Sequence, residues 1–287
     1  MMQNVYKVEK PQGNPLPLIF DSPHSGREYP ADFGYACPFG ALQGAEDSYV
    51  DDLFASAPDH GATLLLALFP RTYIDVNRRE DDIDPDLLAE PWPHPTNPSP
   101  RSHAGIGLIR RLIHPGEPIY NQKFHVKQIQ HRIDNYYKPY HFVLCGLIDD
   151  AHYRFGQAWH INCHSMPSAG AVAASSALQI LPDFVLGDRD GTTCDPNFIH
   201  ALRDFLKGLG YRVAINHPYK GVELIRRYSD PNAGRHSVQI EINKALYWDE
   251  KSNEKGKNYN TLKSDIEKFI EFCARHASEN LVNLAAD

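Results

Sequence analysis

Short apolar runs with the character of β-strands alternate along this chain with longer segments of helical periodicity. One helical segment starts at Asp47, where apolar residues recur at intervals of three and four, and another starts at an acidic N-cap followed by proline, Asp195 and Pro196. Such alternation is typical of an α/β fold with helices on both faces of a sheet. The predicted strands are residues 16–21, 62–69, 71–77, 157–165, 211–216 and 236–243.

Two further helices are predicted, and one long segment has no periodicity. A helix with Ile129 and Ile133 on one face should be kinked or divided at Pro139, which has no backbone N–H to donate. A closing amphipathic helix covers residues 262–273. Residues 90–118 are rich in proline and long for a loop, so we interpret them as an active-site wall or lid within a single domain, residues 1–287.

The composition favours a soluble, cytoplasmic protein with a small anionic substrate. The net charge of −7 argues against nucleic acid or an anionic membrane as a partner. The longest apolar run, residues 62–69, is far shorter than the ~20 residues that span a bilayer, and the first residues lack the apolar core of a signal peptide. The five cysteines form no CxxC pair, so we expect a reducing compartment and a buried, inert Cys163. The oligomeric state stays open.

Four polar residues stand where predicted strands or strand-to-helix turns end: His24, Asp47, His164 and Glu241. In an open α/β sheet, ligand sites form at the edge where strands end. Two histidines and one carboxylate are the ligands of a hydrolytic zinc ion, and a further glutamate can act as general base. We therefore predict one Zn²⁺ ion held by His24, Asp47 and His164.

Each predicted ligand also has an ordinary structural interpretation. His24 stands in the turn S-P-H-S-G and could hydrogen-bond within its own loop. Asp47 could cap a helix, and Glu46 is its nearest rival as a ligand. His160 shares a strand face with His164, but four extended residues of ~3.3 Å each separate them by ~13 Å, so we expect His160 to pack or hydrogen-bond instead.

The predicted general base and substrate residues also have alternatives. A partly desolvated Glu241 with a raised pKa would move a proton from water to the leaving amine, or this residue faces solvent from an edge strand. Asn77 and Arg78 end the segment R-T-Y-I-D-V-N-R-R, and guanidinium binds a carboxylate through two parallel hydrogen bonds. Arg78 could instead pair with Asp75 or with residues 81–82. Lys220 in the loop P-Y-K-G could supply a second positive charge.

Eight motifs in order resemble the N-formylglutamate amidohydrolase family over roughly residues 16–250. The resemblance implies a three-layer α/β/α fold with a mixed, largely parallel sheet, similar to zinc carboxypeptidases. It also implies zinc-dependent deformylation of an acidic N-formyl amino acid, with N-formyl-L-glutamate as the first expectation. The motifs are S-P-H-S-G, an acidic residue before Y-V-D-D-L, I-D-V-N-R, G-x-G-L-I…G-E-P-I-Y, H-S-M-P, L-G-D-R-D-G-T-T-C-D-P, P-Y-K-G and Q-I-E-I-N-K-A-L-Y-W-D-E.

The resemblance also assigns roles to residues. His24, the acidic residue at 47 and His164 would hold the metal, and Glu241 would be the general base. The substrate α-carboxylate would meet Asn77 and Arg78, and the second carboxylate would meet Lys220 or Arg71. These eight residues are the candidate site.

The sequence departs from the family pattern at two places, and the same residues would also suit two other functions. Asn162 stands where the family usually has an aspartate two residues before the second histidine, and this exchange could weaken metal binding. Val222 and Glu223 depart from the usual sequence after P-Y-K-G and bear on the identity of the substrate. The same ligands would suit a non-haem Fe(II) oxygenase. A non-catalytic carboxylate-binding module is the third hypothesis.

Overall fold

The computed structural model describes residues 5–113, 116–168 and 181–284. The chain divides into two compact units. The first unit comprises Met1–Lys7, Pro23–Ser48 and Leu66–Gly146. The second comprises Val8–Ser22, Tyr49–Leu65 and Leu147–Asp287. The single domain expected over residues 1–287 stays a prediction.

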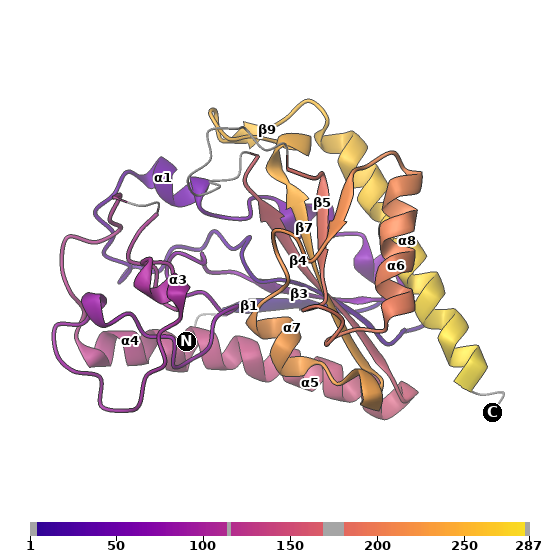
Figure 1. Cartoon of the computed structure of the whole chain (residues 1–287), viewed down its shortest axis with the longest axis horizontal. Coiled ribbons are helices and arrows are strands. Elements are labelled where there is room, and N and C mark those ends of the chain that lie inside the picture. Colours follow the sequence, from indigo (N-terminus) through magenta and orange to yellow (C-terminus); the bar gives the residue numbers. More distant parts are fainter. Residues whose placement is uncertain (1–4, 114–115, 169–180, 285–287) are drawn as a thin grey trace. The chain divides into compact units, whose positions relative to one another are not determined.

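A seven-stranded sheet runs in the order β1-β3-β2-β4-β7-β5-β6 (Figure 1). Within the second unit β2 is parallel to β4 and β4 to β7, whereas β5 is antiparallel to β7 and parallel to β6. The sheet is therefore mixed and mostly parallel, as predicted. The strands are β1 (Tyr6–Glu9), β2 (Leu18–Ser22), β3 (Thr63–Ala67), β4 (Ala158–Met166), β5 (Phe184–Gly187), β6 (Val213–Ile215) and β7 (Arg235–Asn243), and a separate pair consists of β8 (Trp248–Asp249) and β9 (Glu254–Lys255).

Helices of the second unit flank this sheet, which confirms the predicted α/β class. α6 (Pro196–Gly208) and α8 (Tyr259–Leu284) lie side by side, and α7 (Glu223–Tyr228) packs against β4 and β7 (Figure 1). The Asp195 carboxylate accepts the Asn197 N–H at 2.6 Å, so the predicted N-cap is confirmed. The apolar face predicted for the closing helix is buried at Leu262, Ile266, Phe269, Ile270 and Cys273.

The strands that lead to the predicted site are buried. All nine residues of β4 are buried, because this strand lies between β2 and β7. β7 lies between β4 and β5, so the alternative of a solvent-facing edge strand for Glu241 is wrong. Polar residues on these central strands must therefore find partners inside the protein.

The predicted strand at residues 71–77 is wrong. This segment of the first unit consists of turns, in which the Tyr73 N–H bonds to the Pro70 carbonyl at 3.0 Å and the Arg78 N–H to the Asp75 carbonyl at 3.2 Å. The Asn77 N–H bonds to the Asp75 carboxylate at 3.0 Å. Because these short-range bonds use the backbone donors, the segment does not join the sheet.

The long helix changes geometry next to Pro139, as predicted, and the helix after Asp47 is shorter than expected. The long helix is α4 (Val126–Arg132), a π-helical turn (Ile133–Tyr137) and α5 (Lys138–Phe155), so its geometry changes just before Pro139. Proline cannot donate a backbone hydrogen bond, which explains the change. The remaining short helices are α1 (Phe39–Gly44), α3 (Pro100–His103), η2 (Pro85–Leu87) and, in the second unit, α2 (Val50–Leu53), η1 (Ala57–His60), η4 (Pro231–Ala233) and η5 (Lys244–Leu246).

A buried arginine organises the aromatic core of the first unit. The Arg132 guanidinium donates to the carbonyls of Tyr73 (2.9 Å) and Phe33 (3.1 Å) and to the Tyr120 hydroxyl (2.8 Å). Its carbon lies 4.0 Å from the centroid of the Tyr73 ring. These hydrogen bonds and ring contacts offset the cost of removing a guanidinium from water.

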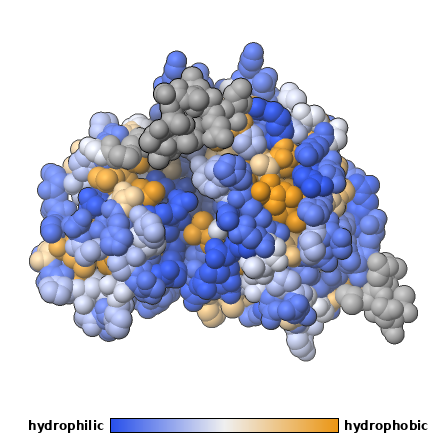
Figure 2. All heavy atoms as spheres, viewed as in Figure 1, coloured by the Kyte–Doolittle hydropathy of each residue, from blue (hydrophilic) through white to orange (hydrophobic). Residues whose placement is uncertain are grey.

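The cysteines, the helices and one face of the surface can each be compared with the expectations from sequence. None of the five cysteines forms a disulfide bond with another described residue, and Cys163 is buried as predicted. Burial raises the pKa of the Cys163 thiol well above its usual value, which disfavours the reactive thiolate. In the part of the chain that the structure describes, no helix is both long and apolar enough to cross a membrane. Figure 2 shows a mostly hydrophilic visible face on which hydrophobic residues form small patches.

Candidate metal centre

The turn after β2 fixes His24 beside Asp47 in the first unit. A Cβ atom on Gly26 would lie 2.3 Å from the Phe69 carbonyl oxygen, so only glycine fits this turn. The Ser25 hydroxyl donates to the Asp47 carbonyl at 2.9 Å, and the Asp47 N–H donates to the His24 carbonyl at 3.2 Å. Both His24 and Asp47 are almost completely buried.

The two ring nitrogens of His24 have different neighbours. Nε2 lies 2.7 Å from Oδ1 of Asp75, and Nδ1 lies 3.4 Å from Oδ2 of Asp47. Because a carboxylate only accepts, Nε2 carries the proton and Nδ1 is the nitrogen that can bind a metal. A carboxylate behind a histidine is the usual way to orient a metal ligand. The turn histidine therefore has the surroundings of a ligand.

Asp47 is a better candidate ligand than Glu46. Glu46 is buried but accepts a hydrogen bond from the Tyr29 hydroxyl. The alternative of a helix cap does not apply to Asp47, because α2 begins at Val50 and its N-cap residue is Tyr49. Asp47 faces the imidazole of His24 instead.

His164 lies in β4 of the second unit at the end of a buried hydrogen-bond chain. The Asn162 amide nitrogen donates to Oδ1 of Asp21 at 2.8 Å, which turns the amide oxygen toward Nε2 of His164 at 2.7 Å. His164 therefore carries its proton on Nε2 and presents Nδ1 as its ligand atom. His160 also bonds to Asp21 (2.8 Å) and to Ser237 (3.1 Å), as expected for a structural histidine.

Glu241 is the register neighbour of His164. The two residues pair across β4 and β7, so their side chains lie on the same face of the sheet. Glu241 is only 8% exposed, and its Oε1 accepts from the Gln239 amide at 2.7 Å. This hydrogen bond orients a buried carboxylate beside a candidate ligand.

Asp75 is a site residue that the sequence analysis missed, except as an alternative partner of Arg78. It is fully buried and contacts His24, Arg71 (2.9 Å) and Arg78 (3.5 Å). Burial alone would raise the pKa of the Asp75 carboxyl, but Arg78, His24 and Arg71 outweigh burial and hold the pKa well below its usual range. Asp75 is therefore an anion at neutral pH.

The residues predicted to bind the substrate differ in their burial and in their hydrogen-bond partners. Arg71 donates to Asp47 at 3.2 Å as well as to Asp75, and so links two carboxylates. Arg78 and Asn77 are buried, and Arg78 donates to the carbonyls of Asn77 (2.9 Å) and Ile106 (3.3 Å). Burial lowers the pKa of Arg78 to about 10, so it still carries its charge at neutral pH.

Lys220 lies on the surface of the second unit. It is more than half exposed and forms an ion pair with Asp190 at 2.7 Å. An exposed pair of this kind contributes little energy and exchanges readily with water.

A second missed residue is Arg110, in the segment G-I-G-L-I-R-R. It is 9% exposed and feels the charges of Asp47, Asp75, Arg71 and Arg78. The sequence offered no signal that separates Arg110 from its partly exposed neighbour Arg111.

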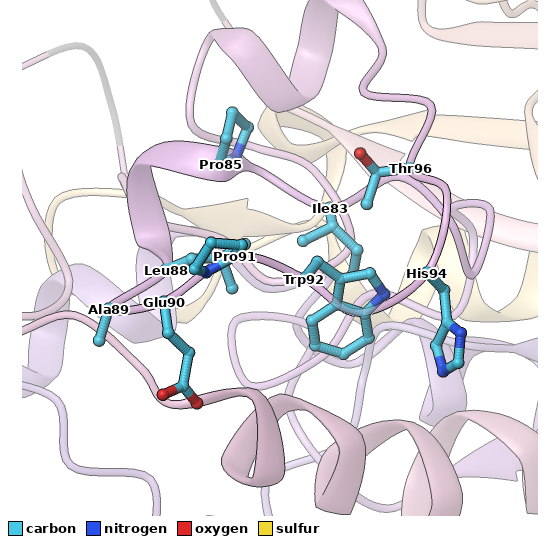
Figure 3. Close-up of a pocket in the computed structure, with 9 residues that line it drawn as sticks. All are labelled: Ile83, Pro85, Leu88, Ala89, Glu90, Pro91, Trp92, His94 and Thr96. Atoms are coloured by element: carbon cyan, nitrogen blue, oxygen red, sulfur yellow. The ribbon is translucent and has the colours of Figure 1, made fainter.

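One pocket of the first unit is separate from these residues. It has a volume of about 380 Å³ and is lined by residues between Ile83 and Thr96. None of them is a predicted metal, catalytic or substrate residue, although those from Glu90 onward belong to the segment predicted as a wall or lid. In Figure 3 the side chains of Ile83 and Trp92 lie close together and the carboxylate of Glu90 points away from them.

The donor set fits a metal ion. His24, Asp47 and His164 each offer a buried ligand atom, and this His–Asp–His group could bind a metal. Both imidazoles have Nε2 hydrogen-bonded to an acceptor, which presents Nδ1. Imidazole and carboxylate suit several divalent ions, so the donors alone do not fix which metal is bound.

Comparisons with known proteins agree on one family. Residues 16–248 match the family model described as N-formylglutamate amidohydrolase. Two curated proteins named N-formylglutamate deformylase, from Pseudomonas putida and Pseudomonas aeruginosa, are each 28% identical and cover 82% and 83% of this chain. This chain covers 83% and 84% of those two proteins.

Solved structures agree as well. A crystal structure of N-formylglutamate amidohydrolase from Ralstonia eutropha JMP134 is 44% identical, with a TM-score of 0.92 over 96% of this chain and 99% of that one. A protein of Agrobacterium tumefaciens shares the fold at 15% identity, with a TM-score of 0.60 over 98% of this chain and 97% of that one.

Proposed function

We propose that this chain, which belongs to the N-formylglutamate amidohydrolase family, hydrolyses the amide bond of an N-formyl or small N-acyl acidic amino acid. N-formyl-L-glutamate, which would give glutamate and formate, is the first candidate. The observation that carries the proposal is the matched surroundings of the two histidines. Each has Nε2 anchored by a hydrogen-bond acceptor, and each therefore presents Nδ1 to a shared ligand.

In this proposal His24, Asp47 and His164 hold one Zn²⁺ ion. The strand register supports the assignment, because Asp21 of β2 pairs with Asn162 of β4, and His24 and His164 each follow within three residues. A bound zinc ion supplies Lewis-acid polarisation of a carbonyl and a water pKa lowered to about 7. Fe²⁺ is the alternative ion for the same donors.

Glu241 is the proposed general base. It would accept a proton from the attacking water and return it to the amide nitrogen as the C–N bond breaks, which leaves formate and a free amine. Its position beside His164 and its hydrogen bond from Gln239 support this role, because both hold the carboxylate in one orientation.

Asn77 and Arg78 are proposed to receive the α-carboxylate of the substrate, and Arg71 and Lys220 are proposed for the second carboxylate. Residues 90–118 are proposed as a wall of the site. In support, the Leu108 carbonyl accepts the Asp75 N–H at 2.8 Å, which ties this segment to the loop that carries Arg71 and Arg78.

Formate release from N-formyl-L-glutamate tests the proposal. The enzyme would be assayed as purified, after removal of metal with a chelator, and after addition of Zn²⁺ or, without oxygen, Fe²⁺. We expect activity to disappear with the chelator and to return with zinc. Activity that survives complete demetallation would contradict the metal assignment, and a zinc-loaded enzyme that releases no formate from N-formyl-glutamate or N-formyl-aspartate would contradict the substrate assignment.

A further inference from the structure

Arg110 is a buried cation without a hydrogen-bonded counter-charge in the described part of the chain. Its side chain is 9% exposed, and Nε has no hydrogen-bond partner among the described residues. No carboxylate of the described residues lies within ion-pair distance of its guanidinium, either. Nε of the more deeply buried Arg132 also lacks a partner, but the guanidinium of Arg132 donates to three acceptors. Arg78 donates to two carbonyls and contacts Asp75.

The backbone places Arg110 beside the charged residues of the first unit. Ile106 and Arg110 form a bridge that closes a tight loop, and Leu108, at the tip of this loop, accepts the Asp75 N–H at 2.8 Å. The loop therefore lies against the segment that carries Arg71, Asp75 and Arg78. The charges that Arg110 feels most strongly are those of Arg71, Asp75, Arg78 and Asp47.

These charges leave an excess of positive charge. Arg71 already links Asp47 and Asp75, at 3.2 and 2.9 Å, and Arg78 also contacts Asp75 at 3.5 Å. Among the residues whose charges Arg110 feels most strongly, both carboxylates therefore already lie within ion-pair distance of other arginines. Burial, with repulsion from Arg71, lowers the pKa of Arg110 well below its usual value, as expected for a cation that lacks compensation.

The burial of Arg110 without a hydrogen-bonded counter-charge is energetically unfavourable in the ligand-free protein. A buried charge is costly unless it is paired and hydrogen-bonded, whereas a surface position would leave the guanidinium hydrated. Arg111, the next residue, is 28% exposed and has a counter-charge, because it pairs with Asp84 at 2.8 Å. The planar fork of a guanidinium matches a carboxylate through two parallel hydrogen bonds.

We propose that Arg110 binds a carboxylate of the substrate and is a determinant of specificity for acidic N-acyl amino acids. This inference rests on the proposed function, which supplies an anion with two carboxylates. It adds a residue to that function, because Arg110 brings a guanidinium whose donors are not used by the protein. The α-carboxylate and the side-chain carboxylate share this chemistry, and the experiment separates them.

The first test compares substrates that differ by one charge. Arg110→Gln, with Arg111→Gln as the matched control, would be assayed on N-formyl-L-glutamate and N-formyl-L-glutamine. Loss of one partner of a buried charge pair predicts a fall in kcat/KM of ~100-fold. A fall confined to N-formyl-L-glutamate assigns Arg110 to the side-chain carboxylate, and an equal fall for both substrates assigns it to the α-carboxylate. Unchanged kcat/KM for both substrates would overturn the proposal.

The second test measures binding and does not need turnover. Glutarate, a dicarboxylate, would be titrated into the wild-type protein and the variants by calorimetry, and the melting temperature would be recorded with and without it. We expect Arg110→Gln to lose the binding and the ligand-induced rise in melting temperature. In the absence of glutarate this variant should melt no lower than wild type, because it removes an uncompensated buried charge.

The two tests separate the proposed function from this inference. Glutarate that binds to wild type and not to Arg110→Gln supports the carboxylate site even if no N-formyl amino acid is hydrolysed. Equal glutarate binding by wild type and Arg110→Gln, or a lower melting temperature of the ligand-free variant with binding intact, would show a structural role and overturn the proposal. If Arg110→Gln does not fold, Arg110→Lys keeps the charge without the fork and should bind glutarate ~10-fold more weakly; unchanged affinity would contradict the proposal.

Discussion

Replacement of Asp75 by asparagine tests the charge network directly. The Asp75 carboxylate accepts from Nε2 of His24 at 2.7 Å and from Arg71 at 2.9 Å, and Arg78 lies 3.5 Å away. Asp75→Asn keeps the size and one acceptor oxygen of the side chain but removes its charge. Arg71 then keeps Asp47 at 3.2 Å, whereas the buried Arg78 loses its ion-pair contact and retains only the weaker influence of the Asp82 charge.

The loss of unfolding free energy expected for Asp75→Asn follows from the burial of the carboxylate and of the charges it contacts. Removal of one partner from a buried ion pair costs about 3–5 kcal/mol, because the other charge stays buried without compensation. The amide oxygen can still accept from His24, so we expect the lower end of this range, about 3 kcal/mol of unfolding free energy. A weaker acceptor behind His24 should also lower metal affinity by ~10–100-fold.

Urea unfolding at pH 7 and a metal competition titration measure these two effects. Asp81→Asn is the matched control, since Asp81 is 45% exposed and pairs with Arg79 at 2.8 Å. An exposed pair is worth at most about 1 kcal/mol, so the control should stay close to wild type. An Asp75→Asn variant as stable as the Asp81 control would refute the reasoning.

The pH dependence has a defined sign. A carboxyl whose pKa is lower in the folded state contributes stability that is fully present above its unfolded pKa of ~3.9 and is lost as the pH falls through the folded pKa. Because the pKa of Asp75 is lowered, the stability difference between wild type and Asp75→Asn should be constant from about pH 7 to 5 and should shrink below about pH 4. A difference that grows on acidification has the wrong sign for this explanation.

Three further changes have defined outcomes. Glu241→Gln should retain metal, measured by elemental analysis, and lose at least ~100-fold in kcat for formate release; full turnover would exclude this residue as general base. Asn162→Ala removes the acceptor of His164 Nε2 and should weaken metal binding ~10–100-fold in a chelator competition, whereas unchanged affinity would show that the hydrogen bond is dispensable. Burial alone would raise the pKa of Asp52, but hydrogen bonds, led by that from Lys263, lower it to about 2, so Asp52→Asn should lose at most about 1 kcal/mol in urea unfolding at pH 7 and less as the pH falls toward 2; a loss that grows on acidification would contradict this.

The elements that the sequence predicted well are those with a local signal. An apolar run followed by a turn located β2 and β4, and an acidic residue before proline located the start of α6. Because parallel strands end at a common edge, the positions of His24 and His164 at two such ends were sufficient to identify them as candidate ligands.

The errors have a common physical cause, which is burial that the local sequence does not reveal. Residues 71–77 have an apolar pattern that suits a strand, but the buried Asp75 carboxylate and short-range backbone bonds hold them in turns. Arg110 and Arg111 are adjacent and chemically identical, yet one is buried and the other pairs with Asp84 near the surface. Only the path of the loop closed by Ile106 and Arg110 decides which of the two arginines lies near Asp75 and its arginine partners.

Asn162 shows how a departure from a family motif can be compensated from another strand. An amide at this position cannot supply the negative charge that an aspartate would place behind His164. The register of β2 and β4 sets Asp21 beside Asn162, and the Asp21 carboxylate accepts from the Asn162 amide at 2.8 Å. The Asp21 carboxylate is therefore separated from the His164 ring by the Asn162 side chain. Because the amide nitrogen of Asn162 donates to Asp21, the amide oxygen faces His164 and accepts from it. The hydrogen bonds therefore still decide which ring nitrogen of His164 is protonated, through a pairing across 141 residues of sequence that a local motif cannot reveal.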